Sequence, residues 1–186
     1  MPTLQQMLQE ADSCKYNKSE NMIITEEVMQ EIVEFLTPTF DPPQATPYRT
    51  ELLESSDTDY QPASPEDIER LMSHLADQIR FSRSTLHPIE LAAMAYKRFI
   101  DIAPFPKDNE EKAEQLMNLI LVRCGYSPVT MPSPSSSPDQ YKEYIEALTA
   151  SRQTNDMEPF SKFITGMVCC PTGTGQHADY KSQNTK

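Results

Sequence analysis

The segment DIAPFPKDNEEKAEQLMNLILVRCGYSPV, residues 101–129, is typical of a loop that runs into a buried helix. From Glu110 to Cys124, apolar residues lie on nearly every side of the predicted helix, as they do in a helix enclosed by others. Gly125 follows directly and suits the left-handed cap with which many helices end. The segment therefore predicts a helical fold with this helix near its centre.

Helical periodicity also precedes this segment, without a clear alternating strand. It predicts a short amphipathic helix at the N-terminus and a second helix over residues 28–36. A third helix is expected to begin at the N-cap Ser64, with Pro65 in its first position and Asp67 three residues after the cap. A fourth begins at His87. The N-terminal half of the chain is thus predicted to be helical.

The C-terminal part of the chain continues the helical pattern. A capping box of Ser137 and Gln140 predicts the start of one helix, and its inward-facing side chains are expected to be Tyr141, Tyr144, Ile145 and Leu148. A last helix is predicted over residues 160–168, and the residues after Cys170 lack periodicity. The fold class is therefore all-α, with an N-terminal helical extension (1–24), one domain (25–170) and a disordered tail (171–186).

The charge of the chain excludes some classes of partner. A net charge of −12, from 28 acidic and 16 basic residues, argues against nucleic acid, whose phosphates need Lys and Arg to replace their counterions. It also disfavours an anionic membrane surface. No apolar run reaches the roughly 18 residues of a membrane-spanning helix, and the N-terminus lacks the pattern of a signal peptide. We therefore expect a cytoplasmic protein.

Metal-binding patterns are also missing from the sequence. The four cysteines show no CxxC spacing, and the three histidines are well separated along the chain. We expect no metal site and no cofactor.

Residues 86–129, LHPIELAAMAYKRFIDIAPFPKDNEEKAEQLMNLILVRCGYSPV, resemble the core of a Fic (Fido) domain. In that family a helix beginning HP-x-E-x-AA leads into the loop H-x-F-x-[D/E]-G-N-G-R-x-x-R, and a buried helix with LMN-x-x-L-x-x-x-GY-x-P follows. Residues 47–65, PYRTELLESSDTDYQPASP, are similar to the family's flap, although their pattern alone favours an ordinary surface loop. The resemblance covers residues 25–168 and implies a Fic-like helical domain with a small β-hairpin flap.

The loop departs from the family pattern at its chemical positions. The family's catalytic histidine corresponds to Ala103, which accepts no proton, whereas Pro104 and Phe105 keep their family identities. The acid that holds Mg²⁺ corresponds to Lys107. The Gly-Asn-Gly cradle and the two phosphate-binding arginines correspond to Asp108, Asn109, Glu110, Glu111 and Glu114. The resemblance therefore implies a degenerate member without AMP-transferase activity.

The acids at the start of the central helix have two interpretations. Asp108, Glu110 and Glu111 suit the positive end of the helix dipole, so they could serve only to stabilise the helix. Alternatively, they form a functional acidic cluster. The sequence leaves both open.

Two functions are compatible with this resemblance. In the first, the pocket between flap and loop is repurposed for a neutral or cationic small molecule, as in a biosynthetic acid/base-type enzyme. Its catalytic residues are then Asp101, Lys107, Asp108, Glu110 and Glu111, and its ligand-binding residues are Ala103, Pro104, Phe105, Asn109 and Glu114. In the second, a pseudoenzyme binds a basic protein segment by β-augmentation at the flap residues Tyr48, Arg49 and Thr50.

Overall fold

Helices account for all the regular structure in the described parts of the chain. The computed structural model describes residues 2–16, 24–37, 48–53 and 60–169. Within these ranges it contains seven α-helices and one 3₁₀ turn: α1 (Leu4–Ser13), α2 (Glu26–Leu36), η1 (Pro65–Asp67), α3 (Ile68–Ser82), α4 (Pro88–Ile102), α5 (Asn109–Arg123), α6 (Pro138–Thr154) and α7 (Glu158–Cys169). The prediction of an all-α fold is confirmed.

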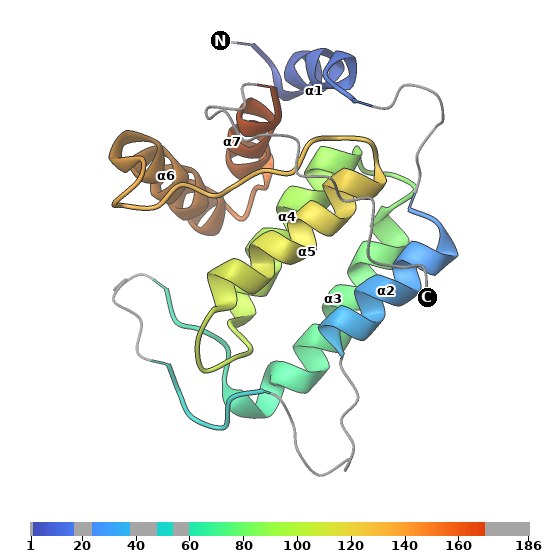
Figure 1. Ribbon diagram of the computed structural model, residues 1–186. Coiled ribbons are helices and arrows are strands. Elements are labelled where there is room, and N and C mark those ends of the chain that lie inside the picture. The colour runs from blue at the N-terminus through green and yellow to red at the C-terminus, as the bar shows by residue number, and fades with distance from the viewer. Residues whose placement is uncertain (1, 17–23, 38–47, 54–59, 170–186) are drawn as a thin grey trace, which may run out of the picture.

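The helices form three layers, with α4 and α5 side by side in the middle (Figure 1). The α2–α3 pair packs on one side of this central layer, and α7 packs on α4 from the other, with α6 against α7. Ten of the fifteen residues of α4 are buried, among them Ala92, Ala93 and Ala95, whose small side chains allow close helix packing. The centre of the core therefore lies along α4, immediately beside α5.

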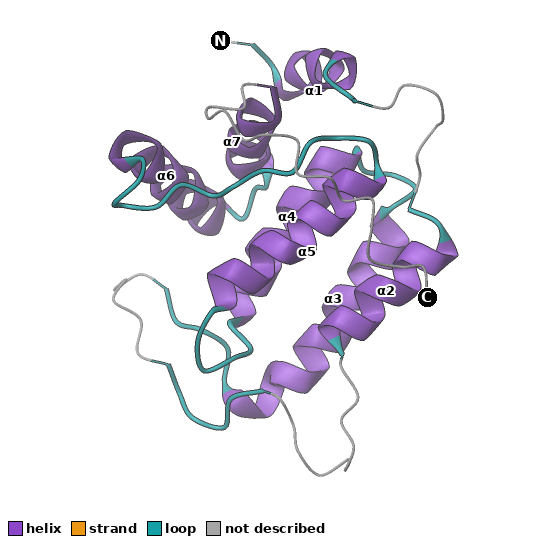
Figure 2. Ribbon diagram, viewed as in Figure 1, coloured by secondary structure: helices purple, strands orange, loops and turns teal. Residues whose placement is uncertain are grey.

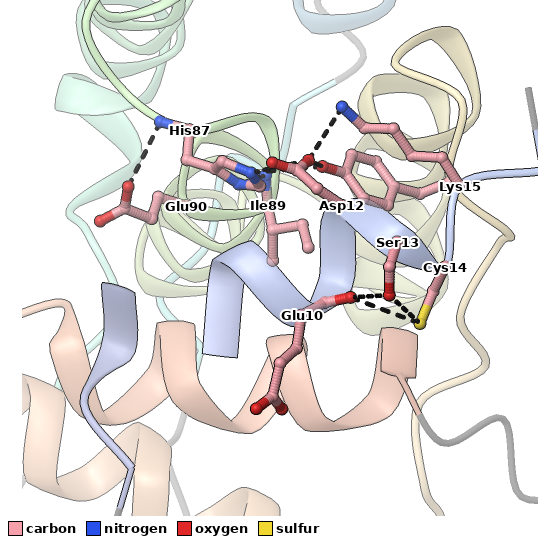
Figure 3. A network of polar contacts seen from close by, with 9 residues as sticks. Glu10, Asp12, Ser13, Cys14, Lys15, His87, Ile89 and Glu90 are labelled. Carbon is pink, nitrogen blue, oxygen red and sulfur yellow. Dashed lines mark hydrogen bonds and ion pairs between the residues drawn. The ribbon is translucent and has the colours of Figure 1, made fainter. Parts of the chain in front are cut away.

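The N-cap of α4 connects the central layer to α1. His87 Nδ1 accepts the Ile89 N–H at 3.2 Å, and the Glu90 carboxylate accepts the His87 N–H at 3.2 Å. Asp12, near the end of α1, lies with Oδ1 3.3 Å from His87 Nε2 and 2.9 Å from Lys15 Nζ (Figure 3). The same oxygen accepts the hydroxyl of Tyr126 at 2.6 Å. His87 thus caps one helix and contacts another, a structural role.

The helices begin after Ser64 and Ser137 as predicted, but their first turns differ from prediction. Both serines occupy the predicted N-cap positions, but neither side chain makes a capping hydrogen bond, so the capping box predicted at Ser137 is wrong. At Ser64 the chain enters the tighter 3₁₀ turn η1, in which the Asp67 N–H bonds to the Ser64 carbonyl instead. Ile145, predicted to face inward, is 39% exposed. Because α6 packs chiefly on α7, its buried stripe is narrow and centres on Tyr144 and Leu148.

The predicted hairpin is not seen in the described part of the flap, and Figure 2 shows no strand in residues 48–53 or 60–65. Residues 54–59 lie outside the described residues, as does the predicted tail after Cys170. No helix within the described ranges is long and apolar enough to cross a membrane.

Candidate functional site

The loop between α4 and α5 is held by buried backbone and apolar contacts. Ala103 ends α4 in the left-handed conformation, with φ 46°, and its N–H bonds to the Phe99 carbonyl. Ala103 and Pro104 are both buried. The ring of Phe105 packs against those of Phe99 and Tyr48, with centroids 6.1 Å and 5.9 Å away. Three of the predicted ligand-binding residues, Ala103, Pro104 and Phe105, therefore anchor the loop to the core.

Asn109 fixes the second half of the loop. Its Oδ1 accepts the Phe105 N–H at 2.9 Å, and its Nδ2 donates to the Phe105 carbonyl at 2.8 Å. Asp108, the N-cap of α5, is also left-handed, with φ 61°. This conformation costs free energy for a residue with a β-carbon, whereas glycine adopts it freely. Asp108 therefore adopts a conformation that favours glycine, the residue that the resembled pattern has at this position.

The charged residues of the loop face water. Lys107, Asp108, Glu110 and Glu111 are all exposed, and the three carboxylates lie at or beside the N-terminus of α5. Negative charge is favourable there because unpaired N–H groups give the helix a positive end. The same carboxylates repel an approaching anion. The arrangement therefore suits a cationic ligand better than a phosphate group.

Glu114 lies one turn farther along α5 and is half-buried. Its Oε2 accepts the Met131 N–H at 2.9 Å. Burial raises the pKa of Glu114 above its usual value; the Met131 bond opposes this shift, and the negative charge of Glu111 adds to it. The two buried hydroxyls of Tyr96 and Tyr144 lie 3.1 Å apart on the adjoining α4 and α6.

Asp101 forms two ion pairs. Its carboxylate lies 2.5 Å from Lys97 Nζ and 2.9 Å from Arg152 Nε. The guanidinium of Arg152 also lies over the ring of Tyr60, 3.8 Å from the centroid. The structure thus divides the predicted catalytic residues into one paired carboxylate between α4 and α6, and four exposed charges on the loop.

The flap residues differ greatly in exposure. Tyr48 is half-buried and donates its hydroxyl to the Leu36 carbonyl at 2.6 Å. Burial raises the pKa of Tyr48 to about 12, and the charge of Glu69 adds to the shift. The side chain of Arg49 is buried, whereas Thr50 is exposed.

Sequence reasoning missed the contribution of three further residues to this region. The i, i+4 spacing of Lys97 and Asp101 would have suggested their pairing. Tyr60 and Arg152 carried no such signal, because they reach Asp101 from 41 and 51 residues away.

Comparison with known proteins places these features in one family. The model of the Fic/DOC family matches residues 23–121. The chain is 34% identical over 108 residues to a protein adenylyltransferase Fic of Nematostella vectensis, covering 58% of this chain and 24% of that protein. It is 34% identical over 104 residues to the protein of the same name from Drosophila melanogaster, covering 55% and 20%. The chain thus spans about a quarter or less of the length of these curated relatives.

Solved structures show the same fold. A Fic domain containing signaling protein from Bacteroides thetaiotaomicron has a TM-score of 0.59 at 23% identity, covering 89% of this chain and 65% of that one. Fic-1 from C. elegans has a TM-score of 0.53 at 24% identity, covering 88% and 46%. At these identities the likeness concerns the fold of the chain alone.

Proposed function

Because the chain belongs to the Fic/DOC family, we propose that it is a Fic-fold protein that does not transfer AMP and that its loop binds a positively charged protein segment. The observation that carries the proposal is the contrast between backbone and side chains in the loop. Asn109 and the left-handed Asp108 maintain the turn before α5, while the chemical side chains differ from the family pattern.

The loss of AMP transfer is argued from four positions. Ala103 stands at the position of the general base, and its buried methyl group accepts no proton. Lys107 stands at the position of the metal-binding acid and offers Mg²⁺ no oxygen ligand. Glu111 and Glu114 stand at the positions of the phosphate-binding arginines. Two like charges about 4 Å apart repel by about 4 kcal/mol at an effective dielectric of about 20, so each of these carboxylates opposes polyphosphate.

The binding of a basic segment is argued from exposure and charge. Asp108 at the end of the loop and Glu110 and Glu111 in the first turn of α5 are exposed. Glu51 is also exposed, on the stretch after Arg49, whose N–H bonds to the loop residue Pro104. We call the first three residues the loop acids. Exposed carboxylates on a braced backbone favour a cationic partner and exclude acidic ones.

An AMP-transfer assay tests the first half of the proposal. Purified protein is incubated with labelled ATP and Mg²⁺, beside a variant in which the family residues are restored (Ala103→His, Lys107→Asp, Asp108→Gly, Glu110→Gly, Glu111→Arg and Glu114→Arg). We expect no label on the unchanged protein and self-labelling of the restored variant. Label incorporated by the unchanged protein would overturn this half.

A charge-matched comparison tests the second half. The probe is a fluorescent ten-residue lysine peptide, measured by anisotropy. Neutralising the loop acids (Asp108→Asn, Glu110→Gln, Glu111→Gln) is compared with neutralising three acids of α6 (Asp139→Asn, Glu143→Gln, Glu146→Gln). At about 0.5 kcal/mol per exposed charge, the loop variant is expected to bind about tenfold more weakly. Equal weakening by both variants would mean that net charge alone attracts the peptide.

A second function, a pocket repurposed for a small molecule, is favoured by one observation. Glu114 is a half-buried carboxyl with a raised pKa, and its negative charge acts on the buried Tyr96, so it could exchange a proton with a ligand. Native mass spectrometry of protein purified gently from its own host, with and without ATP and Mg²⁺, tests this function. A retained non-nucleotide molecule that is lost in Glu114→Gln would support it, and an empty protein would count against it.

A further inference from the structure

We propose that Arg49 is the positioning residue of the binding surface that the flap segment and the loop before α5 form together. Its buried guanidinium clamps both arms of the flap segment to the end of α4. The flap segment here means residues 48–53 and 60–63. The inference rests on the proposed function in one respect, that flap and loop together form the binding surface; the clamp itself rests on geometry alone.

Arg49 is buried to an unusual degree for an arginine. Its relative exposure is 4%, although charged side chains are rarely enclosed without a carboxylate partner. Its guanidinium donates to four backbone carbonyls. Nε donates to the Ala103 carbonyl at 2.7 Å, Nη1 to Glu51 at 2.8 Å, and Nη2 to Ala63 and, at 3.3 Å, to Ile102.

These four carbonyls come from three separate parts of the chain. Glu51 lies on the arm that leaves Arg49, Ala63 lies on the returning arm 14 residues away, and Ile102 and Ala103 lie at the end of α4. One planar guanidinium therefore closes the base of the flap segment and attaches it to the helix. The end of α4 suits a cation because its last carbonyls form the negative end of the helix dipole.

Backbone and aromatic contacts carry the connection into the loop. The Arg49 N–H donates to the Pro104 carbonyl at 2.9 Å. The neighbouring ring of Tyr48 packs on Phe105, whose backbone Asn109 holds on both sides. On the returning arm, the Tyr60 hydroxyl donates to the Asp101 carbonyl. The described residues of the flap segment form no strand pairing. The hydrogen bonds and ring contacts given above therefore connect the flap segment to the rest of the fold.

Lysine cannot reproduce this clamp. An ammonium group has three donors on one nitrogen, whereas the guanidinium has five arranged in a plane. Arg49→Lys therefore keeps the charge but leaves at least one of the four buried carbonyls without its donor, and loses the bridge between the two arms.

Hydrogen exchange of the full chain, read by mass spectrometry, tests the clamp without any ligand. Arg49→Lys is compared with Arg123→Lys, which changes an exposed arginine paired with Glu31. Losing one buried hydrogen bond is expected to speed exchange about tenfold in peptides covering residues 48–53 and 103–109, while α7 keeps its protection. Arg123→Lys is expected to leave both regions unchanged. Arg49→Gln, which retains a planar donor, provides a second variant if Arg49→Lys folds poorly.

Three results would overturn the proposal. Unchanged exchange in both regions would mean that Arg49 does not hold them, and an equal increase in α7 would mean that it supports global stability only. Binding of the lysine peptide distinguishes failure of the clamp from failure of the proposed function. If the unchanged protein does not bind the peptide but exchange rises locally, the clamp stands and the proposed partner fails. If the peptide binds equally well to Arg49→Lys despite local loosening, the clamp does not position the binding surface.

Discussion

Asp101 and Arg152 form an ion pair of 2.9 Å that joins the end of α4 to α6 across 51 residues of sequence. The second carboxylate oxygen of Asp101 lies 2.5 Å from Lys97 Nζ, one turn earlier in α4. The side chains of Asp101, Arg152 and Lys97 are 20%, 16% and 10% exposed, so the three charges are largely removed from water and depend on one another. Asp101 therefore organises a junction between helices, and its use in acid/base chemistry stays a prediction.

Removing the Asp101 charge is expected to destabilise the fold strongly. Asp101→Asn takes away the carboxylate that Lys97 and Arg152 share, and loss of one partner of a buried pair costs about 3 kcal/mol of unfolding free energy. Asp77→Asn is the matched control, because Asp77 is 53% exposed and lies 3.5 Å from Arg80; its expected cost is below about 0.5 kcal/mol. Urea unfolding at neutral pH measures both, and equal losses would contradict the prediction.

Asp12 is expected to make stability depend on acid pH. Burial acts to raise the pKa of Asp12, but the hydrogen bonds from Tyr126 and Lys15 and the nearby His87 outweigh it, so the pKa lies below its usual value of 3.8. A carboxyl with a lowered pKa stabilises the fold above its unfolded pKa and loses that contribution as pH falls through the folded value. The difference in unfolding free energy between the unchanged protein and Asp12→Asn should therefore shrink below pH 3.8. A difference that stays constant from neutral to acid pH would refute this.

Glu114 is expected to show the opposite dependence. Because its folded pKa is raised above the usual 4.5, the folded state binds its proton more tightly, and stability falls as pH rises from 4.5 through the folded value. Glu114→Gln keeps an acceptor for the Met131 N–H and carries no charge, so we expect it to be more stable than the unchanged protein at neutral pH. The two proteins should converge towards pH 4.5, as followed by thermal unfolding. A variant less stable at neutral pH would show that the charge of Glu114 is needed.

Ala103 is expected to accept glycine without loss. Its φ of 46° lies in the left-handed region, where a β-carbon costs about 1 kcal/mol and glycine fits freely. Ala103→Gly should therefore leave stability unchanged or raise it by up to about 1 kcal/mol. Ala113→Gly, at a buried position inside α5, provides the contrast and should lose about 1 kcal/mol or more. Denaturant midpoints measure both, and similar losses in the two variants would rule out backbone strain at Ala103.

Most of the fold was predictable because helix formation is a local property. The stripes of apolar residues that define α2, α4, α5 and α7 repeat within one or two turns, so they can be recognised from residue spacing alone. The flap was less predictable, since what holds its described residues is a buried arginine and carbonyl groups, which leave no periodic pattern. Ile145 was misplaced for a related reason: its exposure depends on how many helices pack on α6.

The sequence by itself determined the helical architecture, the Fic/DOC membership and the identity of the residues in the loop before α5. Only the tertiary structure decided which of those residues meet. It paired Asp101 with Arg152, and it buried Arg49 among the carbonyls of three segments. The physical reason is the separation along the sequence over which each kind of interaction acts. Helical spacing acts over four residues, whereas these contacts join residues up to 54 apart and exist only once the helices have packed.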